Sequence, residues 1–211
     1  WVSQKNNRLI IAVADCTGHG VPGAFMSIMG INFLNEIVNQ SDTIKANEIL
    51  NELRDQLIKS LGQTGRRDET KDGMEMALCI IDTEKKQIQF SGAFRPMYLI
   101  RNEELIVIKG DPMPIGKYNE TEVSFTNKEM PFNENDMIYL FTDGYVDQIG
   151  GLDRKTFKSI QFKKLLKEIH YKPLKEQKAI LLEENGIWRA GLEQIDDIMI
   201  LGVKLSFSQS D

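Results

Sequence analysis

The order of apolar runs along the chain constrains its fold more than any other feature of the sequence. A strand-like run opens the chain, and apolar residues at helical spacing predict two helices after it. Short apolar runs separated by charged turns then indicate a meander of strands, followed by two more helices and a last strand. This order predicts an α+β fold in which antiparallel hairpins are central. The expected strands lie at residues 8–15, 74–81, 87–91, 97–101, 105–108, 122–126, 137–142 and 198–205, and the expected helices at residues 22–38, 44–61, 156–170 and 173–185.

Length and composition describe one soluble globular domain over residues 1–211. Of its 211 residues, 41% are apolar and 27% are charged, so the chain can bury a sizeable core. The net charge of −5 counts against nucleic acid as a partner, because phosphate contacts need a basic face. No apolar stretch is expected to reach the roughly 18 residues of a membrane span. Cys16 and Cys79 lie in apolar runs and are expected as buried free thiols in a reducing cytoplasm.

Three aspartates lie at the ends of apolar runs that are far apart in the sequence. Asp15 and Asp143 each follow such a run, and Asp196 precedes the last one. Buried carboxylates are costly unless positive charge meets them, and hard divalent cations prefer oxygen ligands. The pattern therefore predicts a site for two Mg²⁺ or Mn²⁺ ions. The simpler interpretation is that each aspartate only ends its strand in a turn.

The neighbours of these aspartates favour the metal interpretation. Asp15 opens the run Asp-Cys-Thr-Gly-His-Gly, Asp143 is followed by Gly144, and Asp196 is followed by Asp197. Glycine lets backbone carbonyls and waters approach an ion closely. The sequence has no Cys-x5-Arg nucleophile loop, no Gly-x-Ser-x-Gly elbow and no Walker-type loop with lysine. These absences count against phosphatases, hydrolases and nucleotide-binding proteins built on those motifs.

Five segments, taken in order, carry a resemblance to a known family. They are residues 14–27 (ADCTGHGVPGAFMS), 72–79 (DGMEMALC), 114–116 (PIG), 140–148 (LFTDGYVDQ) and 194–197 (QIDD). Together they span nearly the whole chain and resemble the SpoIIE-like branch of the PPM family, the metal-dependent serine/threonine protein phosphatases. The resemblance implies a β-sandwich of two antiparallel sheets flanked by helix layers, with the metals in a cleft at one end.

The resemblance also implies metal-binding roles for individual residues. Asp15 would bridge two Mn²⁺ or Mg²⁺ ions, and the backbone carbonyl of Cys16 would bind one of them. Asp143 and Asp196 would complete the ligands of the second ion. Asp72 lies near the place where some relatives hold a weaker third ion, and a loop-capping role is the alternative for it.

Further residues beside these ligands receive weaker assignments. Asp147 and Asp197 are candidates for supporting the ligands, with plain solvation as the alternative. Gly18 and His19 belong to a turn that shapes the loop after Asp15, although His19 could instead serve as a general acid. Gly144 would allow a close approach to the metals.

The implied reaction is hydrolysis of phosphoserine or phosphothreonine by a metal-activated water, without a phosphoenzyme intermediate. The expected partner is a phosphorylated signalling protein, such as an anti-sigma-factor antagonist, and a homodimer is a further option. The expected location is the cytoplasm, with any membrane tether lying in N-terminal segments beyond this chain. The alternative function is a regulatory binding module of the same fold with weak or no catalysis.

Two departures from the family pattern qualify these expectations. Trp1 resembles the end of an aromatic cluster that follows an earlier strand with a Gly-Asp pair. The chain is therefore expected to be truncated at its N-terminus, to lack one metal-binding carboxylate, and to follow an upstream sensory or repeat module. Residues 93–96 read Ala-Phe-Arg-Pro where relatives tend to have two asparagines before the proline. Arg95 is interpreted as a surface residue at a strand end, with a phosphate contact as the alternative.

Overall fold

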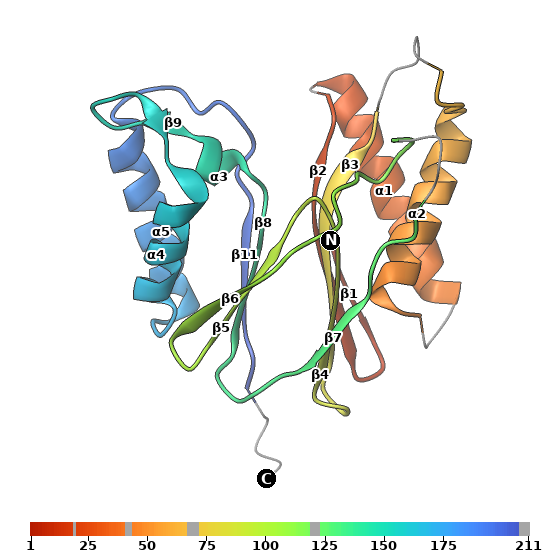
Figure 1. Cartoon of the computed structure of the whole chain (residues 1–211), viewed down its shortest axis with the longest axis horizontal. Coiled ribbons are helices and arrows are strands. Elements are labelled where there is room, and N and C mark those ends of the chain that lie inside the picture. Colours follow the sequence, from red (N-terminus) through yellow and green to blue (C-terminus); the bar gives the residue numbers. More distant parts are fainter. Residues whose placement is uncertain (19, 41–43, 67–71, 119–122, 207–211) are drawn as a thin grey trace. The chain divides into compact units, whose positions relative to one another are not determined.

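The computed structural model of the chain describes residues 1–18, 20–40, 44–66, 72–118 and 123–206 (Figure 1). The chain divides into two compact units. The first unit comprises Trp1–Met97 and Ile108–Phe132, and the second comprises Tyr98–Val107 and Asn133–Asp211. The first unit contains a five-stranded antiparallel sheet, and the second contains a four-stranded antiparallel sheet and a short two-stranded one. Each unit has its own hydrophobic core.

The sheet of the first unit has five strands in the order β1-β2-β3-β4-β7. All of its pairings are antiparallel, and Asp15 at the end of β2 lies opposite Glu75 on β3. Strands β2 and β3 are central, and most of their residues are apolar because neither strand is at a sheet edge. The strands are β1 (Val2–Lys5), β2 (Arg8–Cys16), β3 (Met74–Asp82), β4 (Gln87–Ala93) and β7 (Lys128–Pro131).

Two helices pack on this sheet, α1 (Val21–Gln40) and α2 (Ala46–Leu61) (Figure 1). The buried face of α2 carries leucines such as Leu50, Leu53 and Leu57, which are fully buried. Each such side chain contributes about 1.5–3 kcal/mol through burial. The helices and one face of the sheet therefore form a single core.

The sheet of the second unit has four strands in the order β11-β8-β5-β6, and its end residues Met97 and Ile108 are assigned to the first unit. Its core is rich in aromatic rings, and Phe162 contacts the rings of Tyr98, Phe141 and Tyr145. The elements are β5 (Met97–Arg101), β6 (Glu104–Ile108), β8 (Met137–Phe141), α3 (Gly144–Asp147), β9 (Ile149–Gly150), β10 (Lys155–Thr156), α4 (Lys158–Ile169), α5 (Leu174–Arg189) and β11 (Ile200–Lys204).

The predicted α+β fold with two antiparallel sheets and helices is confirmed. One predicted strand is wrong, because residues 123–126 of the expected strand 122–126 form no strand, and residue 122 lies outside the described residues. Their backbone donors bind side chains instead of a ladder. The Phe125 N–H donates to Asn51 Oδ1 at 3.0 Å, and the Thr126 N–H donates to Asp111 Oδ2 at 2.8 Å. The edge strand β7 begins directly afterwards, at Lys128.

Helix α1 also corrects an expectation about membrane spans. Its 20 residues contain one charged side chain, Glu36, and the helix is long and apolar enough to cross a membrane by length and composition. A single such helix near the N-terminus is weak evidence for a span, since core helices of soluble proteins pass the same test. Here 28% of the apolar window is buried inside the protein.

Candidate metal centre

Asp143 and Asp196 come together in the second unit. Asp143 directly follows β8, and Asp196 lies in the loop before β11, the strand that pairs with β8. A carboxylate oxygen of Asp143 lies within 4.8 Å of one from Asp196. Pairing of β8 with β11 thus brings two acidic residues, 53 positions apart in the sequence, to one place.

Hydrogen bonds around Thr142 fix the backbone that carries these carboxylates. Its hydroxyl donates to the Asp197 carbonyl at 2.8 Å and accepts from the Met199 N–H at 2.9 Å. The Thr142 N–H donates to the Met199 carbonyl at 3.0 Å. On the facing loop, Asp196 Oδ1 accepts the N–H of Asp197 at 2.7 Å. The sequence pattern did not point to Thr142, although it stands directly before Asp143.

Gly144 is needed for the close approach of the two segments. A Cβ at this position would lie 2.4 Å from the carbonyl oxygen of Asp197 and 2.9 Å from its carbonyl carbon. Such contacts are with backbone atoms, which cannot turn away as a flexible side chain could. The Asp143-Gly144 pair is therefore explained by packing against residue 197. On the other side of the pair, the N–H of Asp147 donates to the Asp143 carbonyl at 2.9 Å.

Asp15 lies in the first unit, at the end of β2, and forms an ion pair with the side chain of Arg95. Arg95 Nη2 lies 3.6 Å from Asp15 Oδ2 and 2.7 Å from Glu75 Oε2. The Arg95 side chain is only 13% exposed. The interpretation of Arg95 as a surface residue is therefore wrong, since it joins two acidic residues on neighbouring strands. One signal in the sequence marked Arg95 as unusual, because it stands directly before Pro96, where the chain departs from the family pattern.

The loop after Asp15 is held to the segment before β3. The Thr17 N–H donates to the Gly73 carbonyl at 3.0 Å, and the Gly73 N–H donates to the Thr17 hydroxyl at 2.9 Å. The Asp72 carbonyl accepts from Gln63 Nε2 at 2.6 Å. Gly18 has a φ of +91°, a conformation that favours glycine. A Cβ added to Gly23 would lie 2.6 Å from the carbonyl oxygen of Gly18. His19 lies outside the described residues.

Both cysteines are free thiols, as predicted. Cys79 is buried, whereas Cys16 is half-buried and accepts a hydrogen bond from the Ser27 hydroxyl at 3.6 Å. Burial raises the pKa of the Cys16 thiol, and the Asp15 charge raises it further, while the Ser27 hydroxyl acts against both. Sulfur is a soft ligand, whereas Mg²⁺ and Mn²⁺ prefer oxygen, so the backbone carbonyl of Cys16 suits a hard cation better than its thiol does.

The donor set of these segments suits a hard divalent cation. It consists of carboxylate and carbonyl oxygens, which are the ligands that Mg²⁺ and Mn²⁺ prefer. Among the described residues of these segments, Cys16 is the only cysteine or histidine, whereas a structural zinc site takes four such ligands. Within the second unit, Asp143 and Asp196 offer oxygens of this kind, and within the first unit Asp15 and the Cys16 carbonyl do so.

Residues 5–206 match the model of a protein family described as Stage II sporulation protein E (SpoIIE). The fold and the acidic segments thus define a phosphatase domain of the PP2C-like, or PPM, type. The chain belongs to the SpoIIE family, and the resemblance inferred from its motifs is confirmed.

Solved structures support this placement. The chain is 27% identical to the SiaA-PP2C domain of Pseudomonas aeruginosa, with a TM-score of 0.88 over 98% of this chain and 79% of that chain. A structure of the PP2C phosphatase domain and a fragment of the regulatory domain of SpoIIE from Bacillus subtilis shares 18% identity. Its TM-score is 0.77, over 100% of this chain and 57% of that chain.

RsbX in complex with magnesium is a further structure of the same fold, with 16% identity and a TM-score of 0.60. That match covers 98% of this chain and 85% of RsbX. Comparison with curated protein sequences gave no match.

Proposed function

We propose that the chain is a metal-dependent protein phosphatase that removes phosphate from serine or threonine side chains. The observation that carries this proposal is the meeting of the Asp143 and Asp196 carboxylates beside Gly144, in a SpoIIE-family domain. Two carboxylates within 4.8 Å of each other repel unless a cation or a proton lies with them. A divalent cation meets this requirement with ligands of the right type.

Asp15 completes the proposed ligand set. In this proposal it bridges two Mg²⁺ or Mn²⁺ ions, which the Cys16 carbonyl, Asp143 and Asp196 also bind. The magnesium in the related RsbX structure supports the choice of metal. Such ions, when bound, would lower the pKa of a water and offset negative charge on the phosphoryl oxygens.

The chain's own residues would position these ligands. Thr142 holds the backbone of residues 197 and 199, so the carboxylates of Asp143 and Asp196 stay on adjoining segments. Thr17 holds the loop after Asp15 to Gly73, which places Asp72 next to that loop in the first unit. Asp72 is accordingly proposed as a ligand of a weaker third ion, and Asp197 as a support of Asp196.

The proposed substrate is a phosphorylated signalling protein, such as an anti-sigma-factor antagonist. The regulatory-domain fragment in the related SpoIIE structure supports a further regulatory module next to this domain. We place the reaction in the cytoplasm, where phosphorylated signalling proteins and Mg²⁺ are available. A homodimer is compatible with this function and is proposed with it.

A second candidate, a regulatory binding module with weak or no catalysis, is favoured by one specific contact. Arg95 already supplies Asp15 with a positive charge at 3.6 Å and Glu75 with one at 2.7 Å. A protein cation in this place competes with a metal for the same carboxylate. This candidate predicts that the domain binds a phosphorylated protein without hydrolysing its phosphate.

Hydrolysis of a phosphoserine peptide by the full chain tests the proposal. Activity is expected with Mn²⁺ or Mg²⁺, to disappear on chelation, and to return when the metal is restored. Asp196→Asn should lower the rate about a hundred-fold or more, because a ligand of the cation is lost. Asp153→Asn is the control, since Asp153 is an exposed acid of the same unit. Hydrolysis that persists in the chelator would contradict the proposal, and phosphopeptide binding without hydrolysis would favour the binding module.

A further inference from the structure

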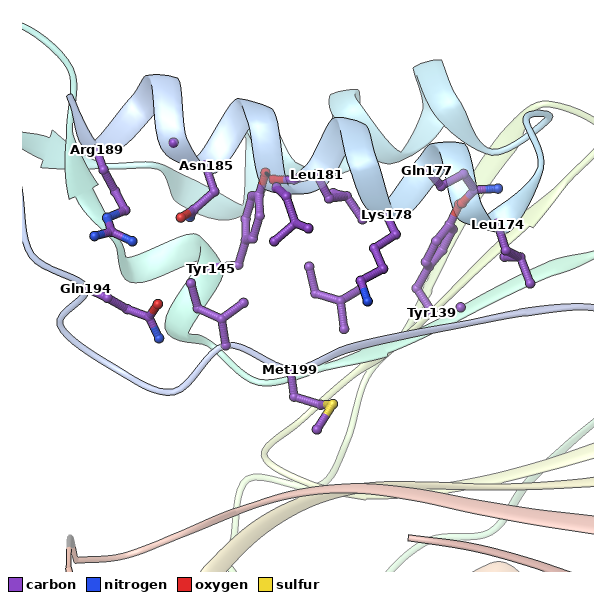
Figure 2. A pocket seen from close by; sticks show the side chains of 15 residues that line it. Tyr139, Tyr145, Leu174, Gln177, Lys178, Leu181, Asn185, Arg189, Gln194 and Met199 are labelled. Atoms are coloured by element: carbon purple, nitrogen blue, oxygen red, sulfur yellow. Dashed lines mark hydrogen bonds between the residues drawn. The ribbon is translucent and has the colours of Figure 1, made fainter. Parts of the chain in front are cut away.

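The second unit contains a cavity of about 610 Å³ between α5 and the strands β8 and β11 (Figure 2). This volume falls within the range of about 300–1,000 Å³ that is usual for small-molecule sites. The aspartates of the candidate metal centre do not line it. Gln194 and Ile198 do, and they stand two positions before Asp196 and one after Asp197. The cavity is thus distinct from the acidic site but borders the segment that carries it.

One face of α5 forms a wall of the cavity. Lys178, Leu181, Asn185 and Arg189 follow one another at helical spacing and point to the same side in Figure 2. Between residues 178 and 189 the helix rises by about 16 Å. The opposite wall is apolar and includes Ile198 and Ile200. A ligand lying along the helix therefore meets an apolar surface with polar groups spaced along it.

Most polar groups in the wall are already satisfied within the protein. The Tyr139 hydroxyl donates to Gln177 Oε1 at 2.6 Å, and the Tyr145 hydroxyl donates to the Leu181 carbonyl at 3.0 Å. The Gln177 amide in turn donates to the carbonyls of His170 and Lys172. These groups shape the wall but have little capacity left for a ligand.

Asn185 differs from them. Its residue is only 9% exposed, its side chain reaches into the cavity in Figure 2, and within the described part of the chain its amide makes no hydrogen bond. The amide faces the cavity, so a ligand group that accepts from its N–H can replace water at this position. One turn further along, Arg189 uses its Nε to bind the Leu192 carbonyl at 3.0 Å. Among the described residues, no partner is found for its two terminal nitrogens.

We propose that this cavity binds a small free carboxylate with an apolar tail, such as a medium-chain fatty acid. The carboxylate lies between Asn185 and the guanidinium of Arg189, because amide and guanidinium N–H groups both donate to it. The tail runs along α5 towards Lys178, over Ile198 and Ile200. At the rim, Leu182 and Met199 are 64% and 54% exposed, and a tail would cover this apolar surface.

Calorimetric titration of the full chain with decanoate tests the site. We expect saturable binding of one molecule per chain. Decanol, which has the same tail without the charge, should bind at least about tenfold more weakly, because it forms no ionic hydrogen bond with Arg189. Binding of decanol as tight as that of decanoate would overturn the carboxylate assignment. The lack of any saturable binding would overturn the site itself.

Gly186 offers a variant that fills the cavity without harming the helix. It lines the cavity, and a Cβ there would meet no atom within 4 Å. Leucine is also a better helix former than glycine. Gly186→Leu should therefore abolish decanoate binding and leave the thermal midpoint unchanged or higher. Glu183→Leu, which adds the same side chain on an exposed part of α5, should bind as the original chain does. Equal binding by Gly186→Leu would overturn the proposal.

Asn185→Leu provides a second test, because it removes the amide but keeps a side chain of similar size in the cavity wall. Loss of the amide donor should weaken decanoate binding at least about threefold and leave decanol binding unchanged. An equal change for both ligands would contradict the assigned place of the carboxylate.

The cavity could instead accept a segment of a second copy of the chain. A dimer in solution that Gly186→Leu dissociates would show this occupant and overturn the small-molecule proposal.

Discussion

At the scale of single residues, the ion pairs of Arg95 explain how Asp15 is tolerated at the end of a central strand. A partly buried carboxylate needs a positive partner, and Arg95 supplies one to Asp15 and to Glu75. The sequence marked Arg95 as a departure from the family but could not reveal its partners. Contacts between residues 80 positions apart depend on the register of β2, β3 and β4, which local patterns do not determine.

Replacing Arg95 should strengthen metal binding by Asp15. Removal of its charge frees the carboxylate and ends the repulsion of an incoming cation, which is worth on the order of 1 kcal/mol in a partly solvated site. Arg95→Asn should therefore lower the Mn²⁺ dissociation constant about fivefold. Lys155→Asn removes the same charge from an exposed pair and should have no effect. Weaker Mn²⁺ binding by Arg95→Asn would mean that Arg95 supports the site.

Gly144 has a structural role that a substitution can isolate. In Gly144→Ala the new Cβ would lie 2.4 Å from the Asp197 carbonyl oxygen, so the backbone must move. We expect a loss of about 1–3 kcal/mol in the free energy of unfolding, the usual cost of overpacking. Urea denaturation measures this loss. Gly186→Ala is the matched control, because its Cβ meets nothing within 4 Å and alanine favours a helix. Equal stability of the two variants would refute this role for Gly144.

At the scale of elements, a buried ion pair holds β5 to the turn before β8. Arg101 Nη2 donates to Asp136 Oδ2 at 2.6 Å, and its Nε donates to Asp136 Oδ1 at 3.0 Å. Asp136 is 1% exposed and also accepts the N–H of Asn133 at 2.8 Å. The carboxylate of Asp136 raises the pKa of Arg101 through these hydrogen bonds.

Asp136→Ala should destabilise the second unit strongly. The substitution leaves the half-buried guanidinium of Arg101 without its carboxylate, and breaking such a pair costs about 3–5 kcal/mol. The exposed pair of Asp153 and Lys155 is the control, and Asp153→Ala should cost less than about 1 kcal/mol. Chemical denaturation followed by tryptophan fluorescence gives both values when Trp1, which lies in the other unit, is replaced by phenylalanine so that Trp188 alone reports. Similar losses in the two variants would contradict the assigned importance of the buried pair.

The main helices and most of the strands could be predicted because their apolar spacing is regular. The helices predicted at residues 22–38 and 44–61 correspond to α1 and α2, with ends that differ by a few residues. The edge strands were harder to predict. β1 and β7 are short, and their residues alternate between exposed and half-buried positions, so neither has a strong apolar signal. The strand predicted around Phe125 was wrong because this apolar residue belongs to a loop, although its side chain is buried in the core.

At the scale of the whole molecule, the proposed ligand set is divided between the two units. Asp15 and the Cys16 carbonyl belong to the first unit, and Asp143 and Asp196 belong to the second. The motifs could be assigned from the sequence because Asp15 and Asp143 each follow an apolar run and have glycine at or near the next positions, while Asp196 is followed by a second acid before the last run. Their order matches a family model over residues 5–206, which covers residues of both units. The single-domain organisation stays a prediction from the sequence, and the binuclear metal site stays part of the proposed function.

Mn²⁺ binding by the full chain and its aspartate variants tests the central claim most directly. Titration calorimetry should give two tightly bound ions per chain, apart from the weaker third ion proposed at Asp72. Asp15→Asn and Asp196→Asn should each reduce the number of bound ions or weaken their binding by at least about tenfold, because both residues are proposed ligands of the same pair of ions. Asp153→Asn should bind Mn²⁺ as the unchanged chain does. Full binding by Asp15→Asn, together with its loss in Asp196→Asn, would contradict a site shared by the two units.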